Sequence, residues 1–169
     1  MSEPQTTAAS SAICIVTTGG TIDKAYFDAL SAYQVIDPVV TKVLSVARVE
    51  YPYRIVELLR KDSLELTDED REQLRKQVAA LETTRVVVTH GTDTMTVSAQ
   101  VLASIPDKTI VLTGALSPGR FAESDASFNL GMAFAAVQTL PAGVYITMNG
   151  EVFRADAVKK DQGRFVSIK

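Results

Sequence analysis

Hydroxyl, carboxylate and glycine residues gather in three short segments of the sequence. The segments read TTGGT at residues 17–21, HGTD at residues 90–93 and TGA at residues 113–115. Adjacent glycines let a backbone turn sharply and approach a ligand closely, which would leave the hydroxyl of Thr21 exposed. The second segment sets the hydroxyl of Thr92 beside the carboxylate of Asp93, where the first turn of a helix can also offer backbone N–H groups. Such a site could activate a nucleophile and bind an oxyanion.

Each segment taken alone also has a purely structural interpretation. A Gly-Gly turn after a strand is more often structural than catalytic, and Thr92 or Asp93 could simply cap the helix that follows. The first segment lacks the further glycines of a dinucleotide site and the lysine of a phosphate loop, so we reject nucleotide binding. Only the coincidence of the three segments favours a catalytic site.

Few other residues could serve as nucleophile, base or metal ligand. His90 is the only histidine, so a histidine-rich metal site is excluded, and we expect this side chain to support the turn around it. Cys14 lies in an apolar run and is expected to be buried and unreactive. A threonine nucleophile needs a nearby base, for which Lys159 and Lys160 are candidates, although two such lysines are normally a solvated pair.

Five short apolar runs predict the strands that must position these segments. The runs cover residues 13–17, 54–58, 85–89, 109–113 and 144–148, and most are apolar on both faces, as is typical of buried parallel strands. Helical patterns lie between these runs. The first begins with Asp37 as N-cap and Pro38 as first helical residue, and the others cover residues 67–81, 93–103 and 125–139. This alternation predicts a three-layer α/β/α fold with a mostly parallel, Rossmann- or flavodoxin-like sheet. The site would lie at the carboxyl ends of the strands.

The composition indicates which kinds of binding partner are expected. A net charge of −3, with lysines and arginines spread along the chain, gives no footprint for nucleic acid or an anionic membrane, so a small polar substrate is expected. Residues 1–11 are small and polar and are expected to form a flexible tail before a single domain at residues 12–169. Because the sequence shows neither a signal peptide nor a membrane-spanning run, we expect a cytoplasmic protein.

The segments, in this order and spacing, resemble the motifs of the bacterial-type L-asparaginases. The resemblance runs from about Ile13 to Lys160 and includes the pair Asp62-Ser63 and the segment at residues 125–130. It implies an amidohydrolase that converts L-asparagine to L-aspartate and ammonia through a threonine nucleophile and an acyl-enzyme, with no metal or organic cofactor.

The resemblance implies catalytic roles for five residues. Thr21 would be the attacking threonine of one triad, and Thr92, Asp93 and Lys160 would form a second triad, with Lys159 as the alternative lysine. Which threonine becomes acylated stays open, because both have plausible activating partners. A tyrosine on the loop after the first segment would polarise the attacking hydroxyl, and Tyr26 is preferred to Tyr33 because it is closer to Thr21 in sequence.

The resemblance also implies a substrate-binding set. Ser63 would hold the substrate α-carboxylate together with the backbone of Gly20 and Gly91. Asp93 would also meet the α-ammonium group, and Ala115 would face the side-chain amide.

Two features depart from the family pattern. Typical members are roughly twice as long and carry a second small domain, which supplies an acidic residue to the site of a neighbouring subunit. The resemblance therefore implies a short form made of the first domain alone, with either a more open site or a group supplied by another subunit. The sequence LSP at residues 116–118 replaces the usual Met-Arg-Pro in a segment of subunit contacts; we still expect a homo-oligomer, either a dimer or a tetramer.

Two other functions remain alternatives. One is a glutaminase or an amidase for a small non-peptide amide, because a site without the second domain would bind the ammonium group of the substrate less selectively. The other is a non-catalytic amino-acid-binding module, which would have no use for Thr21, Thr92 and Lys160 together.

Overall fold

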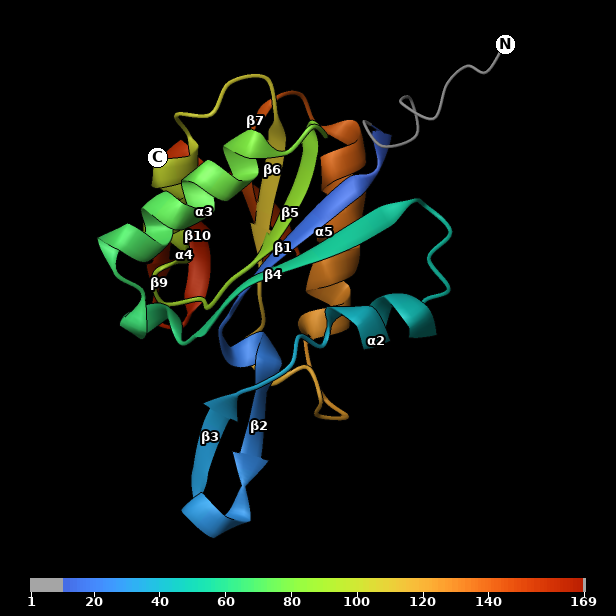
Figure 1. Cartoon of the computed structure of the whole chain (residues 1–169). Helices are drawn as coiled ribbons and strands as arrows, with labels where there is room; N and C mark the ends of the chain where they lie inside the picture. Colours follow the sequence, from blue (N-terminus) through green and yellow to red (C-terminus); the bar gives the residue numbers. More distant parts are fainter. Residues whose placement is uncertain (1–10, 169) are drawn as a thin grey trace.

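A six-stranded sheet forms the centre of the computed structural model, which describes residues 11–168 (Figure 1). Its strands, in spatial order, are β4 (Tyr53–Lys61), β1 (Ile13–Gly19), β5 (Arg85–Thr89), β6 (Thr109–Thr113), β7 (Gly143–Met148) and β8 (Glu151–Arg154). All neighbours pair in parallel except β7 and β8. Numbered along the chain, the parallel strands lie in the flavodoxin-like order 2-1-3-4-5. The predicted fold class and all five predicted strands are therefore confirmed.

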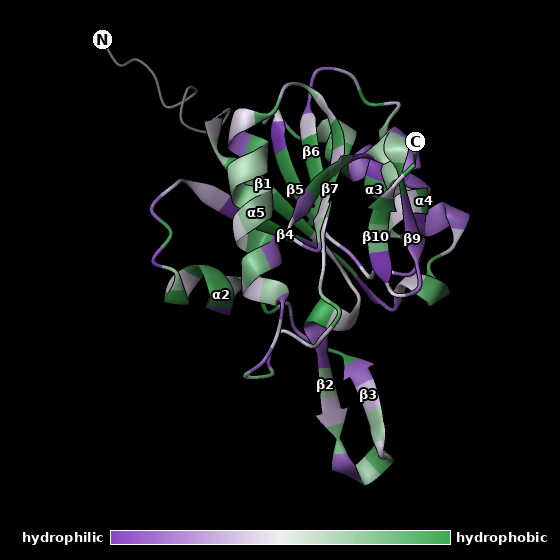
Figure 2. Ribbon diagram, turned by 180° about the vertical axis from the view of Figure 1, so that it is seen from behind, coloured by the Kyte–Doolittle hydropathy of each residue, from purple (hydrophilic) through white to green (hydrophobic). Residues whose placement is uncertain are grey.

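Helices cover both faces of the sheet. α2 (Val40–Val46) and α5 (Ala126–Thr139) lie on one face, and α3 (Asp68–Ala80) and α4 (Met95–Leu102) lie on the other (Figure 1). Side chains alternate between the two faces along each strand, so Ile15 and Val87 pack toward α5 while Val16 and Val88 pack toward α3 and α4. Figure 2 shows the resulting apolar colouring along the central strands. Each such fully buried side chain stabilises the fold by about 1.5–3 kcal/mol, which makes the sheet a rigid base for the loops at its ends.

The helix predicted at residues 67–81 is confirmed almost to the residue. Thr67 caps it by accepting a hydrogen bond from the N–H of Asp70, and the Asp70 carboxylate accepts one from the N–H of Thr67. This reciprocal pair satisfies two backbone donors that would otherwise be unpaired at the helix start. The helices predicted at residues 93–103 and 125–139 correspond to α4 and α5.

The start predicted for the first helix is wrong by two residues. α2 begins at Val40, and Asp37, the predicted N-cap, is exposed and pairs with Arg60 instead. The carboxylate of Asp23, from a distant part of the sequence, accepts the hydrogen bond of the Val39 N–H at 2.8 Å. A tertiary contact therefore replaces the local cap that the Asp-Pro pair suggested.

The structure also contains two small hairpins that were not predicted. One consists of β2 (Lys24–Phe27) and β3 (Ala32–Val35) and projects from the carboxyl end of the sheet (Figure 1). The other consists of β9 (Val158–Asp161) and β10 (Arg164–Ser167), joined by Gln162 and Gly163, both with positive φ. The predicted flexible tail lies outside the described residues, apart from Ser11, whose carbonyl accepts a hydrogen bond from Tyr51. Among residues 11–168, no helix is long and apolar enough to cross a membrane.

Candidate active site

The three glycine-containing turns meet at the carboxyl ends of β1, β5 and β6. A Cβ atom on Gly91 would lie 2.6 Å from the Cβ of Ser63, and one on Gly114 would lie 2.2 Å from the carbonyl oxygen of His90. The turns after β1 and β5 also touch, through Gly20 and Gly91. The strand order reverses direction between β1 and β5, and ligands of such sheets bind at this switch point. Segments far apart in the sequence thus converge where a ligand site is expected.

A lysine from the β9–β10 hairpin joins the turn after β5. The ammonium nitrogen of Lys160 donates to the hydroxyl of Thr92 at 2.9 Å and to a carboxylate oxygen of Asp93 at 2.7 Å. The side chain of Lys160 is only 22% exposed, whereas that of Lys159 is 58% exposed and lies 3.9 Å from Asp161. Alternate residues of a strand point to opposite sides, so β9 can present only one of the two lysines to Thr92.

Thr21 lies at the start of the short 3-10 helix η1 (Thr21–Asp23), which follows β1. Gly20 precedes it with a φ of 90°, a conformation that an L side chain rarely adopts, and Gly20 also has no room for a Cβ atom. Thr21 is partly exposed, and its hydroxyl forms no hydrogen bond with any other described residue. The glycine turn therefore places a free hydroxyl at the edge of the site.

Ser63 provides a second unpartnered hydroxyl, and this one is buried. The residue is 1% exposed and begins the 3-10 helix η3 (Ser63–Glu65) after β4. Its Oγ has no hydrogen-bond partner among the described residues, while its carbonyl oxygen accepts a bond from the Thr94 hydroxyl at 2.8 Å. Buried polar groups without partners are uncommon and call for an explanation, which a polar ligand would supply. Thr94 had not been singled out from the sequence, although it directly follows the HGTD segment.

The two side chains expected to be structural are deeply buried. His90 is fully enclosed; its Nδ1 lies 2.7 Å from the carbonyl oxygen of Gly91 and its Nε2 lies 2.7 Å from the hydroxyl of Ser98. Burial lowers the pKa of His90 to about 4, so the imidazole is neutral at physiological pH and is held between two polar groups. Burial likewise raises the pKa of the Cys14 thiol. The interpretation of His90 as a support for its turn and of Cys14 as a core residue agrees with this geometry.

Ala115, the expected neighbour of the substrate amide, is 1% exposed and packs into the core on the α5 side of the sheet. Its side chain is enclosed, so only its backbone could face a ligand. The adjacent Gly114 packs against the carbonyl of His90, which brings this backbone to the turn that carries Thr92.

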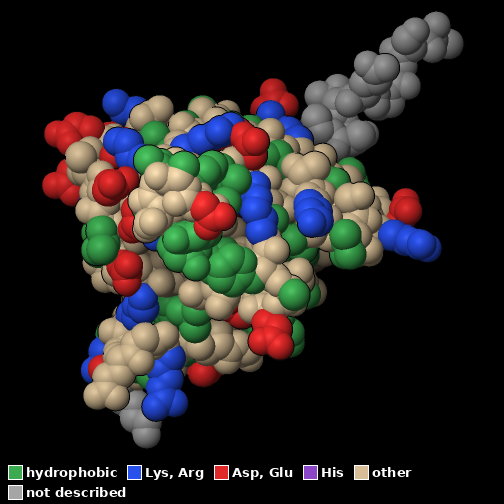
Figure 3. Space-filling model, turned by 90° about the horizontal axis from the view of Figure 1, so that it is seen from below, with side chains coloured by type: hydrophobic (Ala, Val, Ile, Leu, Met, Phe, Trp, Pro, Cys, Tyr) green, Lys and Arg blue, Asp and Glu red, His purple; other side chains and the backbone are tan. Residues whose placement is uncertain are grey.

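The two candidate tyrosines face each other across the β2–β3 hairpin. Tyr26 and Tyr33 are register partners with ring centroids 5.2 Å apart, and Tyr33 also contacts the ring of Phe121 at 6.2 Å. Both tyrosines are about half exposed, and among residues 11–168 neither hydroxyl forms a hydrogen bond with Thr21. The hairpin points toward the viewer in Figure 3, where hydrophobic side chains gather on the surface. The hairpin thus presents an aromatic surface beside the site rather than covering Thr21.

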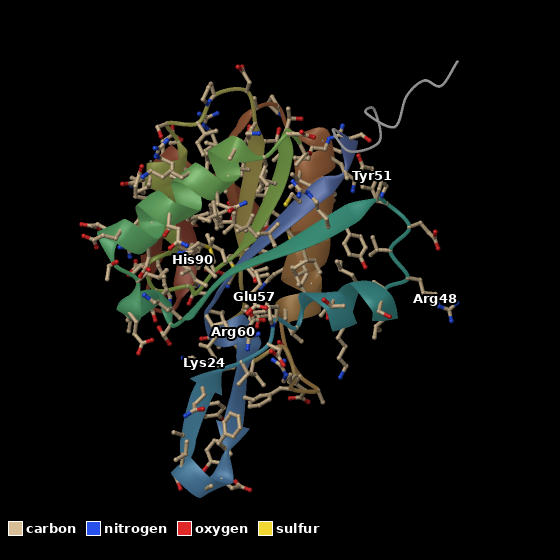
Figure 4. All side chains as sticks on the ribbon, viewed as in Figure 1. Lys24, Arg48, Tyr51, Glu57, Arg60 and His90 are labelled. Atoms are coloured by element: carbon tan, nitrogen blue, oxygen red, sulfur yellow. The ribbon has the colours of Figure 1, made fainter. Side chains whose placement is uncertain are left out.

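The base of this hairpin is anchored by two aspartates that the sequence analysis did not assign. Lys24, labelled in Figure 4 at the base of the hairpin, forms an ion pair with Asp62, the neighbour of Ser63. Asp23 is 2% exposed, and burial raises its pKa to about 6 despite the hydrogen bond from the Val39 N–H. The segment directly after Thr21 is thus connected to Asp62 through Lys24 and to the start of α2 through Asp23. An acidic residue directly after the TTGGTI sequence was the available signal for Asp23.

Comparison with known proteins agrees with the fold and with the family that the sequence resembles. Residues 12–166 match the family model described as "Asparaginase, N-terminal". The glutaminase-asparaginase of Acinetobacter glutaminasificans is 34% identical over 164 residues, which cover 88% of this chain and 49% of that protein. That of Pseudomonas fluorescens biotype A is 29% identical over 172 residues, covering 93% of this chain and 46% of that protein.

Solved structures are similar as well. The thermostable L-asparaginase from Thermococcus kodakarensis superimposes with a TM-score of 0.80 at 25% identity, covering 93% of this chain and 51% of that one. L-asparaginase I from Vibrio cholerae has a TM-score of 0.82 at 26% identity, with 94% and 52% coverage. The chain belongs to the asparaginase family and corresponds to its N-terminal domain. It spans about half the length of the curated relatives it matches.

Proposed function

We propose that this protein is an L-asparaginase, which hydrolyses the side-chain amide of L-asparagine to L-aspartate and ammonia. The observation that carries the proposal is the bridge from the Lys160 ammonium to the Thr92 hydroxyl and the Asp93 carboxylate, at 2.9 and 2.7 Å. A threonine hydroxyl is a poor nucleophile unless a base lies within hydrogen-bond reach, and Lys160 would be such a base once it has given up a proton. Membership of the asparaginase family supports the same activity.

The reaction proposed is acyl transfer in two steps. A threonine hydroxyl attacks the amide carbon and its proton passes to the base; the base then returns this proton to the amide nitrogen, the carbon–nitrogen bond breaks and ammonia leaves. Water attacks the resulting ester in the same way and releases aspartate and the free threonine. Lys160 in its neutral form would accept the proton of Thr92, with Asp93 keeping the lysine in place. Thr21 is the second candidate nucleophile, because its hydroxyl is free and partly exposed.

Backbone N–H groups of the turn after β5 would stabilise the oxyanion of each step. Within residues 11–168, the N–H groups of Gly91, Thr92 and Asp93 take part in none of the turn or loop backbone bonds. Free donors of this kind, held in a fixed geometry, typically contribute roughly 3 kcal/mol each to a hydrolytic transition state.

Substrate binding would use polar groups at the carboxyl ends of the strands. The buried hydroxyl of Ser63, in contact with Gly91, is proposed to bind the α-carboxylate together with the backbone of Gly20. Asp93, whose side chain is 48% exposed, can meet the α-ammonium group while it also pairs with Lys160. The backbone of Ala115 is proposed to face the amide.

Glutamine is the second candidate substrate. Two relatives are named glutaminase-asparaginases, and each aligns with about nine-tenths of this chain. Relative rates of ammonia release from asparagine and glutamine decide which amide is preferred.

Ammonia release from L-asparagine by the purified protein, compared with Thr21→Ala and Thr92→Ala, tests the proposal. We expect turnover that either substitution abolishes, and wild-type turnover in Thr41→Ala, a control at an exposed threonine of α2. Acylated threonine trapped by rapid quenching and found by mass spectrometry identifies the nucleophile. Folded wild-type protein that releases no ammonia from asparagine or glutamine would leave the amino-acid-binding module as the better function.

Assembly and location are part of the proposal. α5 contains no charged residue, and its Phe128 side chain is 63% exposed, which supports a homo-oligomer in which this helix is covered. Sedimentation analysis tests this, and a monomer at micromolar concentration would contradict it.

The buried thiol of Cys14 needs no oxidising partner, which is compatible with the cytoplasm.

A further inference from the structure

The carboxylate of Asp125 holds the turn that follows β6. One oxygen accepts hydrogen bonds from the N–H groups of Leu116 and Ser117, both at 3.0 Å, and the other accepts from Leu116 at 2.9 Å. Asp125 precedes the first residue of α5 but makes no side-chain capping bond to that helix. The Asp125 carboxylate therefore binds the turn after β6 and does not cap α5.

Asn129, one helical turn later, extends the same contact. Its amide nitrogen donates to Asp125 at 2.8 Å and to the carbonyl of Gly114 at 2.9 Å, and the residue is 2% exposed. Gly114 in turn packs against the carbonyl of His90, in the segment that carries Thr92. The side chains of Asp125 and Asn129 thus fix the backbone on both sides of Ala115 and connect it to the catalytic turn.

We infer that Asp125 is a positioning residue, which sets the place of the Ala115 backbone and thereby the fit of the substrate side-chain amide. The inference rests on the proposed function, because it needs an amide to be bound at Ala115. Hydrogen bonds to a charged acceptor are stronger than neutral ones, and a single carboxylate that accepts several of them holds a turn more rigidly than local backbone bonds would. A displacement of about 1 Å in a group that positions the substrate can reduce turnover by about 10²-fold.

Asparagine and glutamine differ by one methylene, so they place the amide at different distances from the α-carboxylate. A turn displaced near Ala115 would therefore change the discrimination between them, whereas Ser63 and the α-carboxylate would be unaffected. A merely structural role for Asp125 would lower the amount of active enzyme and leave this discrimination unchanged.

The test compares the wild type with Asp125→Asn, Asp125→Ser and the control Glu123→Gln, which changes an exposed acid of the same loop. For each protein, kcat and KM are measured on asparagine and glutamine, and hydrogen exchange is followed at the Leu116 and Ser117 amides. We expect Asp125→Asn to lose roughly ten- to a hundredfold in kcat/KM on the better amide, with an altered ratio between the two. We also expect faster exchange at both amides. Asp125→Ser has a shorter side chain that cannot reach the Leu116 and Ser117 amides, so it should lose at least as much as Asp125→Asn, and it replaces that variant if Asp125→Asn does not fold.

The outcomes separate the two proposals. An active wild type and Asp125 variants with an unchanged ratio of the two amides would overturn the positioning role alone. A wild type that releases no ammonia from either amide would overturn the proposed function and, with it, this inference.

Discussion

A Cβ atom placed on Gly20 would lie 2.4 Å from the Cα atom of Gly91. The backbones of the turns after β1 and β5 are therefore in direct contact. Thr21 and Thr92, which directly follow these two glycines, start from neighbouring positions. Such close approach is possible only where both positions lack a side chain. The glycines of the two motifs are thus needed for packing as well as for their turns.

Gly91→Ala is expected to destabilise the fold, because its new methyl group would lie 2.6 Å from the Cβ of Ser63. Overpacking of this kind costs about 1–3 kcal/mol. The matched control is Gly131→Ala in α5: outside the backbone of this helix and the two neighbouring residues, no atom of residues 11–168 lies within 4 Å of the added methyl group, and alanine should stabilise the helix by roughly 0.5–1 kcal/mol. Urea unfolding of both variants measures the two changes. Equal stability of the two variants would contradict the close packing of Gly91 against Ser63.

Lys160→Met should abolish most of the turnover while Lys159→Met retains it. Lys160 contacts Thr92 and Asp93, whereas Lys159 is exposed and pairs loosely with Asp161. Loss of a general base typically reduces the rate by roughly 10²–10⁴-fold. Steady-state ammonia release is the measurement, with thermal unfolding to confirm that both variants fold. Equal losses in the two variants would exclude a specific role for Lys160.

Tyr26→Phe should lower kcat more than Tyr33→Phe does, if the Tyr26 hydroxyl polarises Thr21 once substrate is bound. Both rings lie in one aromatic cluster with Phe121, so each substitution keeps the packing and removes only a hydroxyl. The two variants are therefore matched controls for each other. A larger effect of Tyr33→Phe would transfer the role to Tyr33, and no effect of either would remove the hairpin from the chemistry.

The sheet was predictable because its strands are buried and β-branched. The runs that became β1, β5 and β6 are apolar on both faces, a pattern that only covered strands show. The β2–β3 hairpin has no such pattern, and its three aromatic residues are 38–51% exposed. The start of α2 was misplaced because the acceptor for the Val39 N–H is Asp23, which no local rule for helix caps can identify.

The part of the candidate site that was predictable consists of residue types that have few roles in such turns. Paired glycines and the Thr-Asp pair stood out from the sequence, and the structure brings them together with Lys160. Asp125, Thr94 and Asp23 were not assigned, because an aspartate or threonine near a helix start normally indicates a cap. Their importance depends on contacts with turns that are distant in sequence.

The final prediction concerns Asp23 and the pH dependence of stability. Burial raises its pKa from 3.8 to about 6, so the folded protein binds this proton more tightly than the unfolded chain does. Its contribution to stability is therefore full below pH 3.8 and is lost as pH rises through about 6, a change of roughly 3 kcal/mol. Asp23→Asn keeps an oxygen for the Val39 N–H but cannot ionise, so its stability relative to the wild type should increase between pH 4 and pH 7.

His90 acts in the opposite direction and must be separated from this effect. Its pKa falls from 6.5 to about 4 on folding, so its contribution is present above pH 6.5 and is lost as pH decreases toward 4. Both proteins contain His90, and subtracting their free energies of unfolding at each pH cancels its contribution. Urea titrations at half-unit steps from pH 4 to pH 8 provide these free energies. A difference between Asp23→Asn and wild type that stays constant over this range would show that Asp23 keeps its ordinary pKa in the folded protein.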